Sequence, residues 1–181
     1  MIDYIGDISE QDAVVLKELA EQSTSILEFG CGASTQVLAA YTKGYVVSIE
    51  TAPAWIRKTK VHLERLGLLE VVAFRSYDEF KESPTRPNDL VFNDGVLGLR
   101  REFAMLAWDH IKVDGIMCFH DTRTTPVVLD VAHLFSEKSA EIHSMIVNQD
   151  HSNITVIHKK SAEHYENWNL IEGKEEWEVG R

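Results

Sequence analysis

Two glycines placed one residue apart follow a short apolar run in the segment SILEFGCGASTQ, residues 25–36. Glycine lacks a Cβ, so the main chain at Gly30 and Gly32 can take unusual dihedral angles and approach a ligand closely. The next residues have the pattern of a helix start, where unpaired N–H groups and the hydroxyls of Ser34 and Thr35 suit a carboxylate or phosphate. A dinucleotide loop would carry a third glycine where Thr35 stands, so a nicotinamide cofactor is disfavoured.

A carboxylate ends the second strand-like run, in the segment VVSIE, about 20 residues after the glycines. An acidic side chain at this place can accept hydrogen bonds from both hydroxyls of a ribose. Taken alone, Glu50 would be interpreted as a solvated residue before a helix, where the helix dipole favours negative charge. Together with the glycine pair, Glu50 predicts a ligand that carries the ribose of an adenosine.

Two further carboxylates, Asp94 and Asp121, end the fourth and fifth strand-like runs. Because these strands are neighbours in the predicted sheet, the two side chains can hold a hard divalent cation such as Mg²⁺ through oxygen ligands. The alternative for Asp94 and Gly95 is ordinary turn formation. Because an imidazole ordinarily titrates near neutral pH, His120 is the candidate general base, and the alternative is a hydrogen bond within its own loop.

The rest of the chain alternates helical and strand-like periodicity, and these elements must position the candidate residues. Strands are predicted at 26–29, 45–49, 69–74, 89–93 and 116–119, helices at 9–22, 34–41, 53–66, 77–81, 97–111 and 127–135, and an antiparallel hairpin from 142–147 and 154–158. Such alternation predicts an α/β fold with a doubly wound, mostly parallel sheet, because each parallel crossover needs a helix. Ligands of such sheets bind beyond the carboxyl ends of the strands.

Length and composition limit the classes of function. The 181 residues, 44% hydrophobic, fit one domain, which we place at residues 1–160; an acidic, aromatic-containing tail at 161–181 is expected to be a lid, a dimer contact or a frayed end. A formal net charge of −11 argues against a nucleic-acid partner. No leader-like opening and no apolar run near the roughly 20 residues of a membrane helix are present, so we expect a cytoplasmic protein with no membrane partner.

Four segments, in order, resemble the motifs of the class I S-adenosylmethionine-dependent methyltransferases: EFGCGAST, VVSIE, NDLVFNDG and KVDGIMCFHDT. The pairing of FNDG with FHDT is most similar to the small-molecule branch that includes the catechol O-methyltransferase-like and macrocin-type enzymes. The resemblance implies a Rossmann-like, seven-stranded sheet with a C-terminal antiparallel hairpin. It also implies S-adenosylmethionine across the first two strand ends, a small-molecule acceptor over the fourth and fifth, and a homodimer.

Carried over residue by residue, the resemblance implies a set of contacts. Donor contacts are implied for Glu28, Gly30, Gly32, Ser34, Thr35, Glu50, Ser76, Tyr77 and Asp94, and metal ligands for Asp94, Asp121 and Thr122. Thr122 stands where that branch often has an asparagine ligand, and Leu97 stands where macrocin-type enzymes usually carry a histidine base. His120 is the candidate replacement for that base, so His120 and Asp94 are the candidate catalytic residues.

These expectations combine into an S-adenosylmethionine-dependent methyltransferase that O-methylates a small molecule, with assistance from Mg²⁺. Two alternatives stay open. A non-catalytic donor-binding or assembly protein of the same fold would explain Leu97 as lost chemistry. A nicotinamide-dependent oxidoreductase would need a cofactor loop that Thr35 disfavours.

Overall fold

The computed structural model describes residues 5–125, 143–147 and 152–159. The helices are α1 (Glu10–Glu21), α2 (Ala33–Tyr41), α3 (Pro53–Arg65), α4 (Tyr77–Glu82) and α5 (Arg100–Trp108), with short 3₁₀ helices η1 (Leu69–Val71) and η2 (Leu97–Leu99). The strands are β1 (Ser25–Phe29), β2 (Tyr45–Ile49), β3 (Val72–Arg75), β4 (Asn88–Asn93), β5 (Ile111–Phe119), β6 (His143–Val147) and β7 (Thr155–Lys159). Within the described ranges, no helix combines the length and apolar character that crossing a membrane requires.

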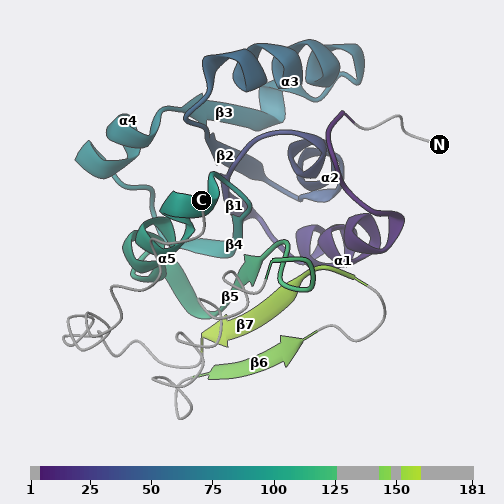
Figure 1. Cartoon of the computed structure of the whole chain (residues 1–181). Coiled ribbons are helices and arrows are strands. Elements are labelled where there is room, and N and C mark those ends of the chain that lie inside the picture. Colours follow the sequence, from purple (N-terminus) through teal and green to yellow (C-terminus); the bar gives the residue numbers. More distant parts are fainter. Residues whose placement is uncertain (1–4, 126–142, 148–151, 160–181) are drawn as a thin grey trace.

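The strands form one sheet in the order β3-β2-β1-β4-β5-β7-β6 (Figure 1). β1 pairs in parallel with both β2 and β4, and β5 is parallel to β4. β7 is antiparallel to both β5 and β6. The predicted mostly parallel sheet with a terminal antiparallel hairpin is therefore confirmed. The strand order reverses between β1 and β4, which is where such sheets bind ligands.

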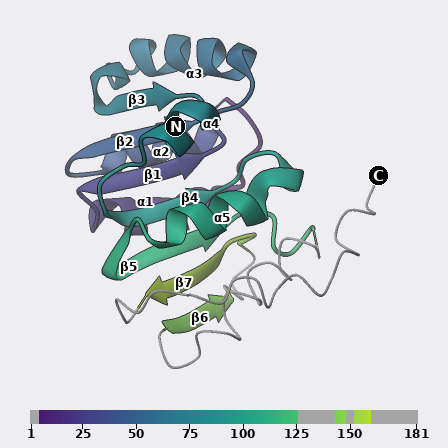
Figure 2. The ribbon, with the colours of Figure 1, turned by 90° about the vertical axis from the view of Figure 1, so that its left-hand side faces the viewer.

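Helices cover both faces of the sheet (Figure 2). On one face α1, α2 and α3 contribute Leu16, Val37 and Leu63 to one buried apolar cluster. On the other face α4 and α5 contribute Phe80 and Trp108 to a second cluster. Because both faces are covered, β1 is buried along its whole length, as expected for a central parallel strand.

Some predicted boundaries were wrong. The strand predicted at 69–74 begins only at Val72, after the turn η1, and the helix predicted at 97–111 ends at Trp108. The chain joins the sheet early because Ile111 pairs with Asn88. Asp114, at φ 65, then lies in a bulge where the register shifts. The helix predicted at 127–135, the domain boundary at 160 and the tail lie outside the described residues.

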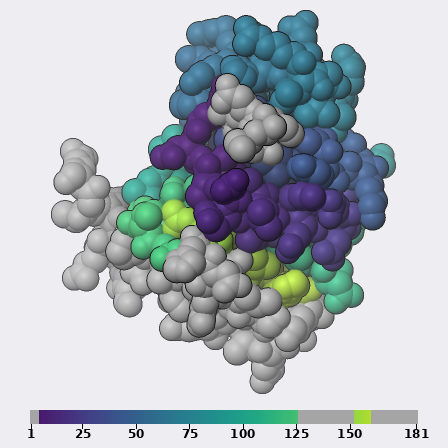
Figure 3. Space-filling view, turned by 90° about the vertical axis from the view of Figure 1, so that its right-hand side faces the viewer, coloured from purple at the N-terminus to yellow at the C-terminus, as the bar shows by residue number. Residues whose placement is uncertain are grey.

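The start of the chain meets its last described segment beside β5. Asn153 donates its main-chain N–H to Asp12 Oδ1 at 2.5 Å, which joins α1 to the residues that lead into β7. Figure 3 shows the purple N-terminal region lying against the yellow segment at 152–159. Asp12 and Asn153 also line the cavity described below.

Candidate active site

The glycine bend after β1 is set by its neighbours in the sheet. Gly30 has φ +92, and a Cβ there would lie 2.6 Å from the carbonyl oxygen of Asp94 and 2.8 Å from Cα of Gly95. The Asp94 N–H donates to the Phe29 carbonyl at 2.8 Å, which holds the end of β4 against the bend. Gly30 is thus required by a left-handed turn and by this close approach. Gly32, by contrast, caps α2, and a Cβ there would meet nothing nearer than 3.8 Å.

Glu28 lies beneath the bend and is fully buried. Its carboxylate accepts hydrogen bonds from Ser34 at 2.6 Å, Thr35 at 2.7 Å and Ser48 at 2.6 Å. Burial raises the pKa of Glu28 to about 7, although the three hydroxyl groups act in the opposite direction. The hydroxyls of Ser34 and Thr35 therefore bind Glu28 and join α2 to β1, and the Ser48 hydroxyl joins β2 to the same carboxylate. Neither Glu28 nor Thr35 is among the described residues that line the cavity below.

Glu50 lies at the end of β2 and faces the glycine bend. Its Oε2 accepts the N–H of Cys31 at 3.0 Å, and its Oε1 accepts the N–H of Ala52 at 2.8 Å. The residue is 9% exposed. The Thr51 hydroxyl also donates to Oε1 at 3.3 Å, so a ligand hydroxyl that binds this oxygen would take the place of that contact. The sequence prediction that this carboxylate adjoins the bend agrees with its position.

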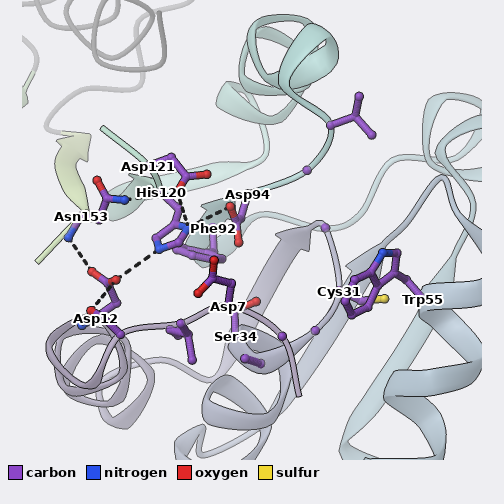
Figure 4. Close-up of a pocket in the computed structure, with 18 of the residues that line it drawn as sticks. Asp7, Asp12, Cys31, Ser34, Trp55, Phe92, Asp94, His120, Asp121 and Asn153 are labelled. Carbon is purple, nitrogen blue, oxygen red and sulfur yellow. Dashed lines mark hydrogen bonds and ion pairs between the residues drawn. The ribbon is translucent and has the colours of Figure 1, made fainter. Parts of the chain in front are cut away.

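A cavity of about 860 Å³ opens at the carboxyl edge of the sheet. Its lining comes from the N-terminal segment, the glycine bend, the first turns of α1, α2 and α3, the ends of β2, β4 and β5, and the residues before β7. It includes Asp7, Asp12, Gly30, Cys31, Gly32, Ser34, Glu50, Trp55, Phe92, Asp94, Val96, His120, Asp121, Arg123 and Asn153. Figure 4 shows Trp55 and Cys31 at one end and the cluster around His120 at the other. The cavity thus spans the two strand ends that the sequence assigned to a donor and the two that it assigned to an acceptor.

His120 is held between carboxylates from different elements (Figure 4). Its Nδ1 lies 2.9 Å from Asp94 Oδ1 and 3.4 Å from Asp121 Oδ1, and its Nε2 lies 3.3 Å from Asp12 Oδ2. Burial would lower the pKa of the imidazole, but the hydrogen bond and charge of Asp94, with Asp121 and Asp12, raise it to about 9. His120 is therefore an imidazolium at neutral pH.

Arg100, at the start of α5, contacts both acidic residues of the expected metal site. Its Nη2 lies 3.0 Å from Asp94 Oδ1 and 2.9 Å from Asp121 Oδ2. Ligand atoms of Asp94, His120 and Asp121 lie within 4.8 Å of one another, a spacing that would suit a cation. The side chain of Arg100 already fills that role, so the residues present do not fit a divalent ion.

Three further predicted residues lie away from the cavity lining. The hydroxyl of Thr122 donates to the Asn153 carbonyl at 3.3 Å and accepts from Thr155 at 3.0 Å. The Ser76 hydroxyl caps α4, and the Tyr77 ring belongs to the apolar core below the sheet. In the described part of the chain, the expected ligand role of Thr122 and the expected donor contacts of Ser76 and Tyr77 are therefore not brought to the cavity.

Two charged residues that contact the cluster around His120, Arg100 and Asp12, were missed by sequence reasoning. Arg100 follows no motif, since it lies in the helical segment GLRREF where a basic residue is ordinarily solvated. Asp12 carries the signature of a helix start, and its carboxylate does accept the Ser9 hydroxyl at 2.6 Å. The same carboxylate also reaches His120, 108 residues away in sequence, and no local pattern encodes that contact.

The sequence matches no protein-family model and no curated protein. Solved structures match well. The chain is similar to the O-methyltransferase TomG from Streptomyces achromogenes, solved in complex with SAM (TM-score 0.67, 19% identity, 86% of this chain and 82% of that one). It is similar to an O-methyltransferase from Bacillus cereus in complex with SAH (TM-score 0.68, 18% identity, 86% and 83%). It is also similar to a methyltransferase-like protein from Silicibacter pomeroyi (TM-score 0.68, 17% identity, 95% and 96%).

At these identities the likeness shows the fold. The chain has the Rossmann-like fold of the class I S-adenosylmethionine-dependent methyltransferases, with the cavity at the carboxyl edge of its parallel strands.

Proposed function

We propose that this chain transfers a methyl group from S-adenosylmethionine to a hydroxyl group of a small molecule. The observation that carries the proposal is Glu50, a nearly buried carboxylate that contacts the glycine bend and also lines the cavity. A nearly buried carboxylate that lines a cavity suits the paired hydroxyls of a ribose.

The chain's own residues provide a place for the donor. Glu50 accepts the ribose hydroxyls, the main chain from Gly30 to Gly32 and the start of α2 face the amino-acid end, and Trp55 lines the cavity next to Cys31. When bound, the donor supplies an electrophilic methyl group on a positively charged sulfur. A volume of about 860 Å³ leaves room for a small acceptor beside it.

Transfer to an acceptor oxygen would form a C–O bond as the C–S bond of the donor breaks, with the electron pair of that bond left on sulfur. The hydroxyl proton passes to the Asp94 carboxylate, which lines the cavity, and then to water. His120 orients Asp94 as a fixed cation, because an imidazolium has no free lone pair for a proton.

Mg²⁺ assistance, which the resemblance implies, has no step in this proposal because Arg100 already contacts both carboxylates. A cytoplasmic location is supported by two buried free cysteines, Cys31 and Cys118, which suit a reducing compartment. A homodimer rests on the family resemblance, and light scattering of the purified chain tests it.

Calorimetric titration with S-adenosylhomocysteine and with NAD tests the donor site. We expect binding of S-adenosylhomocysteine only, and at least about ten-fold weaker binding by Glu50→Ala, since hydrogen bonds to a charged group contribute about 1.5–3 kcal/mol. Glu70→Ala, which changes an exposed glutamate of η1, is the matched control and keeps full affinity. Unchanged affinity in a folded Glu50→Ala protein would count against the proposal.

Transfer of a labelled methyl group to a panel of phenols, catechols and sugars tests catalysis. Product with any member supports the proposal. Binding of S-adenosylhomocysteine together with no transfer to any acceptor would favour the non-catalytic donor-binding alternative.

A further inference from the structure

Arg100 lies at the centre of the acidic cluster and is anchored by two loops. Its side chain is 7% exposed, its Nε donates to the Gly95 carbonyl at 2.8 Å, and its Nη1 donates to the His120 carbonyl at 2.8 Å. The Asn93 side chain in turn donates to the Arg100 carbonyl at 2.7 Å, which fixes the start of α5 against the end of β4. The guanidinium therefore joins the loops that follow β4 and β5.

The contacts of the guanidinium are those of a cation shared by two carboxylates. One nitrogen, Nη2, lies 3.0 Å from Asp94 Oδ1 and 2.9 Å from Asp121 Oδ2. An Mg²⁺ ion would need about 2.0–2.1 Å to the same oxygens, so the nitrogen and the ion cannot both lie between them. Displacing the arginine would also leave a buried, permanently charged group without its partners, which is strongly destabilising.

The two carboxylates already share a permanent positive charge. Asp94 and Asp121 provide two negative charges, and the guanidinium of Arg100 contacts both. A divalent ion added here would face this cation within contact distance of its own ligands. A lysine could neutralise one carboxylate as a point charge, but only a planar guanidinium has enough donors to reach two carboxylates and two carbonyls together.

We propose that Arg100 is an internal substitute for a divalent cation: it positions Asp94 and Asp121, and the cluster binds no metal ion while the arginine is present. Arg100 is a positioning residue, because it does not line the cavity among the described residues. The inference concerns the cation alone and stands whether or not the chain transfers a methyl group.

Titration of the purified chain with Mn²⁺, followed by electron paramagnetic resonance of the free ion, tests the inference. We expect no bound Mn²⁺ in the unsubstituted chain. We expect one bound Mn²⁺ in Arg100→Ala, because removal of the guanidinium frees two adjacent carboxylates. Its affinity should be at least about ten-fold above that of any residual Mn²⁺ binding by the unsubstituted chain. Arg100→Lys keeps a cation near the carboxylates and should bind none.

The controls separate this site from other acidic groups of the chain. Arg101→Ala removes the neighbouring arginine of α5 and should behave as the unsubstituted chain. The double substitution Arg100→Ala with Asp121→Asn should lose the Mn²⁺ that Arg100→Ala gained. One Mn²⁺ bound by the unsubstituted chain and lost in Asp121→Asn would overturn the proposal, and so would a folded Arg100→Ala protein that binds none. If Arg100→Ala does not fold, comparison of the unsubstituted chain with Asp121→Asn decides alone.

Discussion

Glu28 is fully buried and surrounded by hydroxyl groups, and the balance of burial and hydrogen bonding decides its charge. Three short hydrogen bonds from Ser34, Thr35 and Ser48 favour the ionised form, but complete burial outweighs them and raises its pKa to about 7. A carboxyl group whose pKa is raised by folding binds its proton more tightly in the native protein than in the unfolded chain. Its contribution to stability is complete below about pH 4.5 and is lost as the pH rises to about 7.

Glu28→Gln should therefore flatten the pH dependence of stability in this window. For the unsubstituted chain we expect the free energy of unfolding to fall by up to about 3 kcal/mol between pH 4.5 and pH 7 through this group. Urea denaturation at several pH values measures it. Glu18→Gln, on the exposed face of α1, is the control that should leave the slope unchanged. An unchanged slope in Glu28→Gln would show that another group titrates.

His120 and Arg100 show how neighbours decide what a side chain does. A histidine at the end of β5 was a reasonable candidate for a base, yet three carboxylates around it raise its pKa and hold both ring nitrogens. An arginine in a helical segment without a motif lies instead between two of these carboxylates. The residue type sets the chemistry available, and the contacts select which part of it is used.

At the scale of elements, the ends of β1 and β4 are held together by the glycine bend. Gly30 has φ +92 and lies against the main chain of Asp94 and Gly95, so it places the donor side of the cavity next to the cluster. Gly67, which follows α3, has φ +69, but a Cβ at that position would meet nothing within 4 Å, and it offers a comparison. The two glycines share a left-handed conformation and differ in the room around them.

Gly30→Ala should destabilise the protein by more than Gly67→Ala does. The left-handed conformation alone costs an alanine about 1–2 kcal/mol, which is the effect expected for Gly67→Ala. At Gly30 the Cβ would also meet the Asp94 carbonyl oxygen at 2.6 Å, so we expect at least about 2 kcal/mol more, or failure to fold. Thermal and urea unfolding measure both variants. Equal losses would show that the β4 loop yields easily to a larger residue.

For the whole molecule, the cluster around His120 joins parts of the chain that are far apart in sequence. Asp12 comes from α1, Asp94 follows β4, and Asn153 precedes β7, and these residues and His120 are linked through a few polar atoms. The net charge of this group of residues depends on His120, whose pKa is raised from 6.5 to about 9. Folding should therefore be linked to pH through this histidine.

The sign follows from the direction of the shift. A histidine whose pKa is raised by folding contributes stability that is complete below about pH 6.5 and is lost as the pH rises through about 9. We expect the free energy of unfolding of the unsubstituted chain to fall by up to about 3 kcal/mol over this range. His120→Gln should be less stable at about pH 6.5 and show little of that fall, as urea titrations at about pH 6.5, 8 and 9.5 will reveal. His62→Gln, on α3, is the control; a steep fall retained in His120→Gln would contradict the linkage.

The order of helices and strands could be predicted from the sequence because periodicity and glycine placement are local properties. The alternation up to β5, the terminal hairpin and the location of the glycine bend and Glu50 at neighbouring strand ends were all available from short segments. The boundaries near 69–74 and 97–111 were wrong, because the pairing of Ile111 with Asn88 and the turn at η1 depend on tertiary contacts.

The chemistry of the acidic cluster was decided by the tertiary structure. The sequence placed Asp94, His120 and Asp121 at adjoining strand ends and favoured Mg²⁺ between the two aspartates. It contained no signal that Asp12 and Arg100 would reach the same point, since charge pairing across the fold depends on distances that only packing sets. Two adjacent carboxylates need a cation between them, whether a metal ion or a side chain. The fold supplies that cation from within the chain, as the guanidinium of Arg100.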